Sequence, residues 1–255
     1  MQGFQATILR FDSLASTNDE LASQAAAGAA EGLCIVAGEQ TAGRGRLQRQ
    51  WSSPAGAGLY LSVLLRPKVA PQLWTLLPLL AALAVHDALL SASNLETDIK
   101  WPNDILWRGR KLCGILAETI ETNPGRAVVL GIGINLNNNA FPPELANTAT
   151  SIAAACGRPD AEELLQTVVR ALAARYAELS AEDGPGKLRR EWLMRSSYGE
   201  GKRVRISNGG DVLEGITRGL ESDGALRLET ESGELKIVRA GDVTNLRPVA
   251  PLLVD

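Results

Sequence analysis

The segment "DIKWPNDILWRGRKLCGILAETIE", Asp98–Glu121, is the part of the chain that decides its fold. Two apolar stretches, "DIKWPNDILW" and "KLCGILAETIE", flank the basic turn "RGRK", which is typical of two β-strands joined by a turn. Polar and basic side chains, among them Lys111, lie where these strands begin or end, close to Gly114. The pattern predicts a sheet whose strand ends carry charged groups.

The rest of the chain predicts an α+β fold followed by a small all-β module. Apolar periodicity and capping residues predict helices packed on one face of a sheet over residues 1–197. From residue 198 the pattern changes to short alternating strands separated by the turns "NGG", "SDG" and "ESG", which predicts a small β-barrel over 198–255. Further strands are expected at 4–11, 33–40, 58–67 and 126–137, and helices at 16–32, 72–92, 161–179 and 186–196.

Composition excludes several classes of protein. At 255 residues, 45% hydrophobic and 22% charged, the chain has the balance of a globular protein with a substantial core. A net charge of -3 and a pI of about 5.4 argue against a surface that binds nucleic acid or acidic membrane throughout. Three widely spaced cysteines indicate neither a disulfide framework nor a zinc site, and the single histidine, His86, excludes a multi-histidine metal site.

The N-terminus and the most apolar stretch indicate where the protein works. The three cysteines fit a reducing cytoplasm best, and the start "MQGFQATILR" lacks the charges, apolar run and cleavage site of a signal peptide. Residues 73–90 are the most apolar stretch, but Pro78, His86 and Asp87 interrupt them. The stretch is also shorter than the roughly 20 residues of a membrane span. We therefore expect a buried helix and no membrane contact.

A basic loop, "TAGRGRLQRQWSSPAG" (Thr41–Gly56), follows one expected strand and is named the arginine loop here. Its three arginines stand among glycines, and no acidic residue of the loop neutralises them. Arginine pairs with phosphate through a planar fork, and glycine lets a loop fold over an anion. The Walker pattern G-x-x-x-x-G-K-[ST] is absent from the sequence. The dinucleotide-binding pattern G-x-G-x-x-G is also absent, because Gln48 and Leu136 occupy the place of its last glycine in "GRGRLQ" and "GIGINL". Taken alone, the loop also fits a solvated basic turn.

Together these segments strongly resemble the biotin protein ligase family. The blocks "STND", "GEQTAGRGRLQRQWSSPAGAGLYLSVLLRP", "IKWPNDILWRGRKLCGILAE" and "VVLGIGINLN" occur in that family's order and at its usual separations. The resemblance extends through "ATSI", and "GKRVRISN" and "GDVTNLRP" are similar to the family's closing module, so essentially the whole chain is covered. It implies a mixed sheet with packed helices, of the class II aminoacyl-tRNA-synthetase-like type shared by biotin and lipoyl ligases, and a small SH3-like β-barrel.

The resemblance implies a two-step, ATP-dependent ligation. Biotin's carboxylate attacks the α-phosphate of Mg-ATP, giving biotinyl-adenylate and pyrophosphate; a lysine of a biotin carboxyl carrier protein then accepts the biotinyl group and releases AMP. The arginine loop would close over the adenylate and shield the mixed anhydride from water. ATP and Mg²⁺ are the implied cofactors, biotin is a substrate, and the carrier domain of a biotin-dependent carboxylase is the implied partner.

The resemblance also bears on domain content and assembly. Some bacterial members carry an N-terminal DNA-binding domain and act as repressors. Here "STND" begins at Ser16, so the short class without that domain is expected. A homodimer formed through a sheet edge beside the arginine loop is compatible with the pattern.

The family's site residues carry over to the positions of this chain that match its motifs. Lys111 would contact the biotin carboxyl and the α-phosphate, Arg46 would offset phosphoryl charge, and Asp104 would accept the incoming lysine's proton. No resident metal site is expected. The implied biotin-binding residues are Ser16, Thr17, Asn18, Gln40, Arg44, Gly45, Arg46, Lys111 and Gly114, and the implied ATP- or adenylate-binding residues are Arg44, Arg46, Trp51, Asn103, Lys111 and Asn135.

Several of these residues also have ordinary structural explanations. Ser16 stands at a helix N-cap position, and that role alone would account for it. Asp104 could pair with Lys100 or Arg110. A place in the core, or close packing of strands, would likewise account for Trp51, Trp101, Gly114, Gly131 and Gly133.

Two other functions remain open on the sequence. One is a nucleic-acid-binding module, although the acidic pI and only three Phe and three Tyr argue against it. The other is a lipoate ligase of similar fold. Acyl transferases of the lipoyl-attachment group use a cysteine, but Cys113 lies in an apolar strand pattern without a histidine partner and is interpreted as a buried structural thiol.

One position departs from the family pattern. The family commonly has a glycine where this chain has Gln48. Glutamine narrows the backbone freedom of the loop, so slower or less complete loop ordering is expected without loss of activity. A Gln48→Gly variant should then release biotinyl-adenylate at a different rate from the parent.

Overall fold

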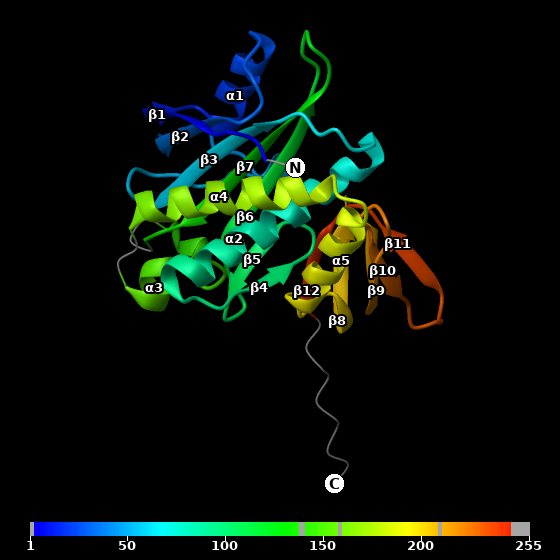
Figure 1. Cartoon of the computed structure of the whole chain (residues 1–255). Coiled ribbons are helices and arrows are strands. Elements are labelled where there is room, and N and C mark those ends of the chain that lie inside the picture. The colour runs from blue at the N-terminus through cyan, green and yellow to red at the C-terminus, as the bar shows by residue number, and fades with distance from the viewer. Residues whose placement is uncertain (1–2, 138–140, 158–159, 209–210, 246–255) are drawn as a thin grey trace.

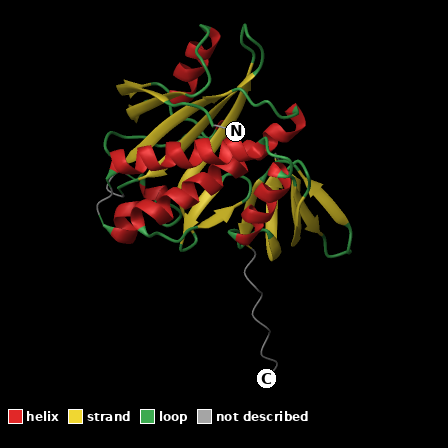
Figure 2. Ribbon diagram, viewed as in Figure 1, coloured by secondary structure: helices red, strands yellow, loops and turns green. Residues whose placement is uncertain are grey.

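The chain is built around two β-sheets, as Figures 1 and 2 show. The computed structural model describes residues 3–137, 141–157, 160–208 and 211–245. The first sheet has the strand order β1-β2-β3-β7-β6-β5-β4, and it is mixed because β1 and β2 run parallel while the other neighbours run antiparallel. Its strands are β1 (Thr7–Leu14), β2 (Leu33–Gln40), β3 (Gly58–Leu65), β4 (Asp98–Lys100), β5 (Asp104–Trp107), β6 (Arg110–Ile120) and β7 (Ala127–Asn135).

Helices cover both faces of this sheet, whereas the sequence predicts them on one face. Side chains alternate along β3: Leu61 and Val63 pack into the cluster that contains α2, and Leu64 packs with α1 on the opposite side. The prediction is wrong because an amphipathic helix reveals that it buries one side, not which sheet face it covers. The helices are α1 (Thr17–Ala26), α2 (Leu77–Ser93), α3 (Ile152–Cys156), α4 (Ala161–Leu179) and α5 (Gly184–Met194).

Helix α2 is the buried centre of the first part. The helix expected at 72–92 begins as a 3-10 turn, Pro71–Leu76, and continues as α2. Residues 71–93 are long and apolar enough to cross a membrane, yet 61% of their most apolar window is buried inside the protein. A helix that is apolar on all sides fits a core position. In Figure 1, α2 and α4 lie side by side across the sheet, and α2 also contacts α5.

The segment that opened the sequence analysis forms more strands than predicted. Residues 98–107, predicted as one strand, are the two strands β4 and β5, which pair antiparallel around a turn at residues 101–103. The Trp101–Pro102 peptide bond in this turn is cis. Because proline cannot donate a ladder hydrogen bond, "WPN" interrupts the strand even though its neighbours are apolar. Strand β5 then pairs with β6 across the predicted basic turn.

Two helix starts also differ from the sequence expectation. Helix α5 begins at Gly184, two residues earlier than predicted, with Pro185 in its first turn, where proline is favoured. The short helix α3 was not predicted. It follows Ser151, whose side chain accepts a hydrogen bond from the Ala154 N–H, and it is too short to show a helical period.

The C-terminal module is an antiparallel sheet with the strand order β11-β10-β9-β8-β12. Its Leu226 belongs to the same hydrophobic cluster as α2, so one core runs through both sheets. The indole N–H of Trp101 donates to the carbonyl oxygen of Gly224 at 3.0 Å, which confirms the core interpretation of Trp101. Residues 209–210 of the expected "NGG" turn and residues 246–255 lie outside the described residues. The strands are β8 (Glu200–Asn208), β9 (Asp211–Leu220), β10 (Leu226–Glu229), β11 (Leu235–Val238) and β12 (Asp242–Asn245).

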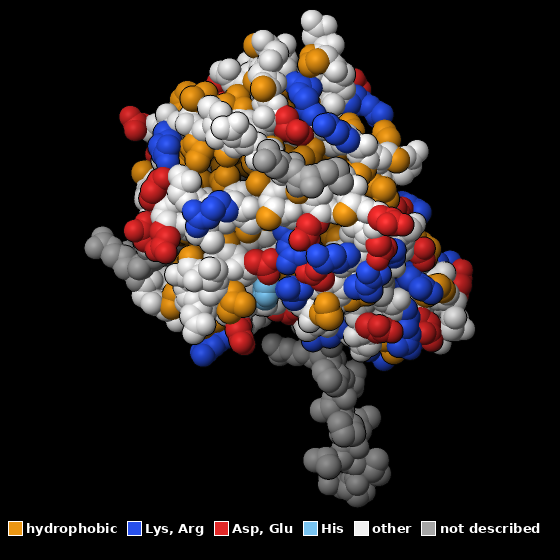
Figure 3. All heavy atoms as spheres, viewed as in Figure 1, with side chains coloured by type: hydrophobic (Ala, Val, Ile, Leu, Met, Phe, Trp, Pro, Cys, Tyr) orange, Lys and Arg blue, Asp and Glu red, His pale blue; other side chains and the backbone are white. Residues whose placement is uncertain are grey.

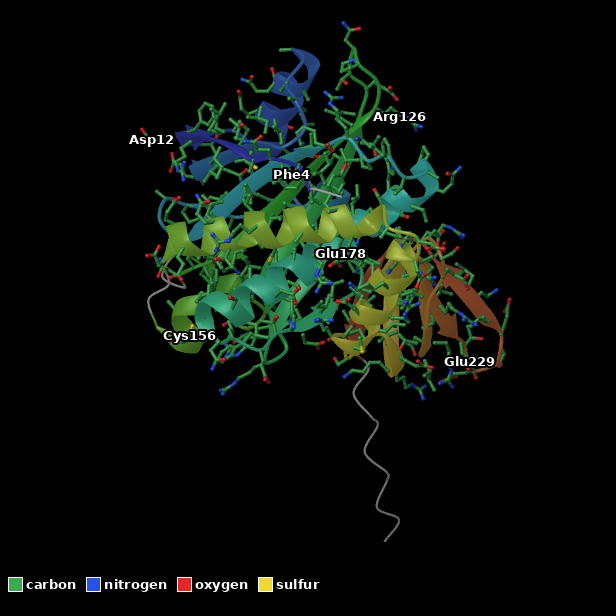
Figure 4. The ribbon with its side chains drawn as sticks, viewed as in Figure 1. Phe4, Asp12, Arg126, Cys156, Glu178 and Glu229 are labelled. Atoms are coloured by element: carbon green, nitrogen blue, oxygen red, sulfur yellow. The ribbon has the colours of Figure 1, made fainter. Side chains whose placement is uncertain are left out.

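Ion pairs join helices α2, α4 and α5, which pack against one another. Charged side chains of both signs are intermingled there in Figure 3, and Figure 4 labels Glu178 at the end of α4. Arg175 of α4 donates at 2.5 Å both to Asp87 of α2 and to Glu191 of α5, and its side chain is only 16% exposed. Burial works against the charge on Arg175, but the hydrogen bonds to Asp87 and Glu191 raise its pKa overall. Burial likewise acts to raise the pKa of Glu191, yet Arg175 lowers it overall.

An Arg175→Met variant is expected to lose about 2–3 kcal/mol of unfolding free energy at neutral pH, because Asp87 and Glu191 would lose their nearest shared cation and keep the longer contacts to Arg195. Because folding lowers the pKa of Glu191, its stabilisation is present above the unfolded pKa of about 4.3 and is lost as pH falls through the folded value. The deficit should therefore shrink below about pH 4. Urea unfolding at neutral pH and below about pH 4 measures this loss of unfolding free energy. The control Arg10→Met removes an exposed pair with Glu162 and should cost less than about 1 kcal/mol; equal losses would contradict the account.

Candidate active site

A single cleft of about 950 Å³ contains every residue that the resemblance implies for the site. It is bounded by one face of the seven-stranded sheet, the start of α1, the arginine loop and strand β12. Its volume suits small-molecule ligands. The implied residues that line it are Ser16, Thr17, Asn18, Gln40, Arg44, Gly45, Arg46, Trp51, Asn103, Asp104, Lys111, Gly114 and Asn135.

The start of α1 is fastened to the end of β2 at one end of the cleft. The Ser16 hydroxyl accepts a hydrogen bond from the Asp19 N–H at 3.4 Å, so Ser16 is the N-cap and also lines the cleft. The Thr17 N–H and hydroxyl donate to Gln40 Oε1 at 2.8 and 3.0 Å. Gln40 Nε2 donates to the Ser53 hydroxyl at 2.8 Å. These bonds fix the orientation of the hydroxyl and amide groups that face the cleft.

Three glycines leave the sheet face beneath the cleft without side chains at the points where Trp51 and Asn18 approach it. A Cβ atom on Gly133 would lie 2.6 Å from Trp51 Nε1, and one on Gly114 would lie 2.9 Å from the same ring. A Cβ atom on Gly131 would lie 2.4 Å from Asn18 Oδ1. The glycines therefore permit side chains of the loop and of α1 to approach the sheet closely. The buried indole N–H of Trp51 has no hydrogen-bond partner within the described part of the chain.

The arginine loop is neutralised from outside its own sequence, which corrects the expectation of unpaired cations. Arg44 donates to Asp19 at 2.5 Å and to the two oxygens of Glu118 at 2.8 and 3.1 Å. Burial acts to lower the pKa of Arg44, but Glu118 and Asp19 raise it overall. Arg49, at the other end of the loop, forms an ion pair with Asp242 of β12. The sequence could not show this because all three carboxylates come from distant elements.

Arg46 differs from its two neighbours on the loop. Its guanidinium donates to Asn103 Oδ1 at 3.3 Å and to the Gly241 carbonyl at 3.4 Å, and no described carboxylate lies within ion-pair distance of it. Burial lowers the pKa of Arg46, although Asp242 and Asp104 act in the opposite direction. A largely buried guanidinium without a paired anion is costly. The geometry therefore offers Arg46 to an anionic ligand.

Lys111 lines the cleft beside Asp104 and Trp51. Its Nζ is 2.6 Å from Asp104 Oδ1, and Lys100 Nζ is 3.6 Å from the other oxygen of the same carboxylate, so the Asp104–Lys100 pairing that the sequence allows is present. The Lys111 ammonium also lies 5.2 Å from the centroid of the Trp51 ring. The Lys111 N–H donates to the Thr148 carbonyl at 2.8 Å, which fixes the backbone beneath the side chain. The ammonium is thus held by contacts that a ligand could exchange.

Asn103 and Asn135 use their amides mainly to hold the backbone. Asn103 Nδ2 donates to the Ile115 carbonyl at 2.6 Å, while its oxygen accepts from Arg46. Asn135 Nδ2 donates to the Thr150 carbonyl at 2.9 Å. Both residues line the cleft, so contact with a triphosphate stays a prediction for each.

The donor set does not fit a resident metal ion. Within the described ranges, no group of three His, Cys, Asp or Glu side chains could hold one. Mg²⁺ is usually bound by one or two carboxylates together with phosphates and waters. Asp104, the carboxylate beside Lys111, is already engaged by two lysines. We therefore treat magnesium only as part of a nucleotide substrate.

Comparisons with known proteins show the family of this chain. The Biotin/lipoate A/B protein ligase family matches residues 11–135, and the Biotin protein ligase C terminal domain matches residues 201–244. The bifunctional ligase/repressor BirA of Bacillus subtilis is 39% identical over 91% of this chain and 72% of that protein. The biotin–[acetyl-CoA-carboxylase] ligase of Mycobacterium tuberculosis is 39% identical over 91% of this chain and 86% of that protein. The chain belongs to the biotin protein ligase family.

Solved structures of biotin protein ligases share the whole fold. The Aquifex aeolicus ligase in complex with biotin and ATP superposes with a TM-score of 0.82 at 29% identity, covering 96% of this chain and 100% of that one. The Leishmania major ligase in complex with biotinyl-5-AMP gives a TM-score of 0.63 at 26% identity, covering 93% and 100%. Both sheets of this ligase therefore belong to the family's architecture.

The loop residue where glycine would be favoured is Leu47, not Gln48. Leu47 has a φ of 55° within the short 3-10 turn Arg46–Gln48. A positive φ is costly for a branched side chain and easy for glycine. The expected effect of Gln48 on loop ordering stays a prediction, while Leu47 is the strained position of this turn.

Sequence reasoning missed four residues that hold the site of this ligase. No local pattern marks the acidic ones, because they reach the loop from elsewhere: Arg44 and Glu118 are 74 positions apart. Ser62 could have been found, since it is a polar residue in the middle of an apolar strand. It is fully buried and donates to Asn18 Oδ1 at 2.6 Å. The four residues are Asp19, Ser62, Glu118 and Asp242.

The three cysteines of the ligase differ in access to solvent. Cys34 and Cys113 are buried, and Cys156 is exposed at the end of α3, where Figure 4 labels it. Burial raises the pKa of Cys34 to about 12 and raises the pKa of Cys113 far above its ordinary value. A thiol that stays protonated is a poor nucleophile. Cys113 therefore fits a structural thiol rather than an acyl carrier.

Iodoacetamide at mildly alkaline pH is expected to alkylate Cys156 of the folded ligase and to leave Cys34 and Cys113 unmodified, because Cys156 is exposed whereas burial shields the other two thiols and raises their pKa. Peptide mass spectrometry measures the labelling, and urea-unfolded protein, in which all three should react, is the control. Fast alkylation of Cys113 in the folded ligase would contradict its assignment as a structural thiol.

Proposed function

We propose that this ligase attaches biotin to a lysine of a biotin carboxyl carrier protein through biotinyl-5'-AMP, with release of pyrophosphate and then AMP. The observation that carries the proposal is the convergence of Lys111 and Arg46 on one cleft, where the glycine-cleared sheet face lies beside them. Solved relatives hold biotin and ATP, or biotinyl-5-AMP, as bound ligands, which supports the same assignment.

In the first step the biotin carboxylate attacks the α-phosphorus of Mg-ATP, the bond to the β-phosphate oxygen breaks, and pyrophosphate leaves. Two anions must approach each other, so positive charge placed between them lowers the barrier. Lys111 supplies a compact, mobile ammonium, and Arg46 supplies a planar fork for the phosphoryl oxygens. Biotin would lie with its ring toward Thr17, Asn18 and Gln40, whose polar groups face the other end of the cleft.

In the second step the amine of the carrier lysine attacks the acyl carbon, the bond to the phosphate oxygen breaks, and AMP leaves. The attacking amine must lose a proton, and Asp104 is the carboxylate nearest to Lys111 in the cleft. When Lys111 turns toward the phosphate, its ion pair with Asp104 opens and one oxygen becomes able to accept that proton. Lys100 keeps the other oxygen in place.

Between the steps the arginine loop would keep water from the mixed anhydride. Its fastening at both ends supports this role, because Arg44 binds the start of α1 and β6 while Arg49 binds β12. A carrier domain of a biotin-dependent carboxylase is the proposed acceptor. The cytoplasmic location and a homodimer stay predictions.

The proposal is tested by incubating the ligase with biotin, Mg-ATP and an isolated biotin carboxyl carrier domain, and by measuring acceptor mass over time. We expect one biotinyl group on one lysine, with no transfer when lipoate replaces biotin. Transfer of lipoate with comparable efficiency would establish the lipoate ligase instead. Binding of a labelled oligonucleotide at physiological salt, without any acylation, would favour the nucleic-acid-binding module.

A further inference from the structure

The C-terminal module contributes two contacts to the arginine loop. Asp242 of β12 forms an ion pair with Arg49, and the neighbouring Gly241 carbonyl accepts a hydrogen bond from Arg46 at 3.4 Å. Asp242 itself lines the cleft. The part of the loop at Arg46 and Arg49 is therefore tied to the second sheet, whereas Trp51 and Ser53, further along the loop, contact the first sheet.

The loop's other end is tied to the catalytic sheet. Arg44 binds Asp19 at the start of α1 and Glu118 on β6, at distances between 2.5 and 3.1 Å. Arg46 stands between these two fastenings and has no ion-pair partner among the residues described. Residues 44–49 of the loop are thus held by Asp19 and Glu118 at one end and by Asp242 at the other, and the Arg46 guanidinium between them is kept at the cleft.

We infer that Asp242 is a positioning residue: it clasps the arginine loop to the C-terminal module and thereby holds Arg46 over the cleft. The expected consequence of this clasp, retention of the activated intermediate, rests on the proposed function. The contact itself is independent of that function.

The Asp242 carboxylate also reduces the repulsion between Arg46 and Arg49. Arg46 and Arg49 are both cationic and lie close enough for Arg49 to lower the pKa of Arg46, in addition to the larger lowering by burial. The charge of Asp242 raises the pKa of Arg46, so it acts against the effects of burial and of Arg49. Without that carboxylate, two guanidinium groups would repel each other on one short loop, and the simplest relief would be for the loop to swing outward.

The docking of the module makes this clasp firm. Trp101, next to the cis bond and two residues before Asn103, donates its indole N–H to the Gly224 carbonyl of the second sheet at 3.0 Å. Thr75 at the start of the α2 region donates its hydroxyl to the carbonyl of Asp223 at 2.6 Å. A module that is fixed to the first part of the chain by these contacts, of which the Trp101 bond is buried, can hold a loop at another point.

The first test uses the ligase without substrates, so its result is independent of the proposed activity. Trypsin cleaves after arginine, and its rate within the arginine loop reports how often that loop opens. Asp242→Asn is expected to raise the cleavage rate at Arg44 and Arg46 by about three- to fivefold, the size that a partly exposed ion pair supports. The control Glu231→Gln breaks the exposed ion pair with Arg203 elsewhere on the same module and should leave the rate unchanged.

The second test measures the intermediate. The ligase is loaded with biotin and Mg-[α-³²P]ATP, the acceptor is withheld, and the loss of protein-bound adenylate is followed. Asp242→Asn should lose it about three- to fivefold faster than the parent, at an unchanged melting temperature. The charge-swapped double variant Arg49→Asp/Asp242→Arg should restore slow cleavage and slow loss, because it re-forms the ion pair with its charges exchanged.

Each outcome decides the matter. If Asp242→Asn matches the parent in loop cleavage, or if the charge swap restores neither rate, the clasp is wrong. If loop cleavage behaves as expected but the parent forms no adenylate, the clasp stands and the proposed function fails. If cleavage rises while adenylate loss does not, Asp242 fastens the loop without retaining the intermediate, and the inference is overturned.

Discussion

Replacing Lys111 with alanine should lower the rate of adenylate formation by about 10²–10³-fold, the usual effect of removing one group that stabilises developing charge. The ammonium lies 2.6 Å from Asp104 and faces the cleft, so it can follow negative charge from the carboxylate to the phosphate. The loss should appear mainly in kcat, because the interaction strengthens in the transition state. Biotin-dependent release of pyrophosphate measures it.

A matched control separates this effect from simple loss of charge. Lys100→Ala removes the more distant lysine, 3.6 Å from Asp104, and should reduce the rate by less than about tenfold. The Lys111 side chain is 34% exposed, so its truncation should leave the melting temperature nearly unchanged. Full activity of the Lys111→Ala variant would remove Lys111 from the mechanism.

Arg46→Gln is the second substitution expected to have a large effect, with adenylate formation reduced about 100-fold. Arg46 is the loop arginine that has no described carboxylate partner, and its guanidinium is largely buried. Glutamine keeps a hydrogen-bonding group for Asn103 but removes the charge. Single-turnover conversion of ATP with saturating biotin measures the chemical step.

The neighbouring arginine supplies the control for this substitution. Arg49→Gln removes a charge that Asp242 already neutralises, so adenylate formation should fall only about three- to fivefold. Similar losses in both variants would mean that the loop acts through its overall charge and that Arg46 has no special role.

Several strands and helices could be predicted because their sequences carry local signals. The strand at 33–40 and the helix Ala161–Leu179 were predicted with the bounds that the structure shows, since apolar periodicity marks each directly. Ser16 was likewise expected as an N-cap, because a capping residue acts within one turn of its helix. The split of residues 98–107 was missed because apolar patterning outweighed the proline in "WPN".

The residues of the candidate site could be named from the sequence only through the family's motifs, and their roles stay predictions. All thirteen implied residues line one cleft, which strand order and spacing could not have established alone. The partners of the loop were beyond reach, because a salt bridge such as Arg44–Glu118 depends on how β6 sits beside α1 in space. The glycines were seen, but what they clear room for, the Trp51 ring above Gly133, depends on tertiary packing.

The most direct test of the account is biotin-dependent exchange of labelled pyrophosphate into ATP, measured without any acceptor protein. Exchange requires that the carboxylate attack the α-phosphorus reversibly, so it isolates the first step at Lys111 and Arg46. The account predicts exchange that needs biotin, is not supported by lipoate, and is nearly abolished in Lys111→Ala and Arg46→Gln. Exchange that proceeds without biotin, or that survives in both variants, would contradict it.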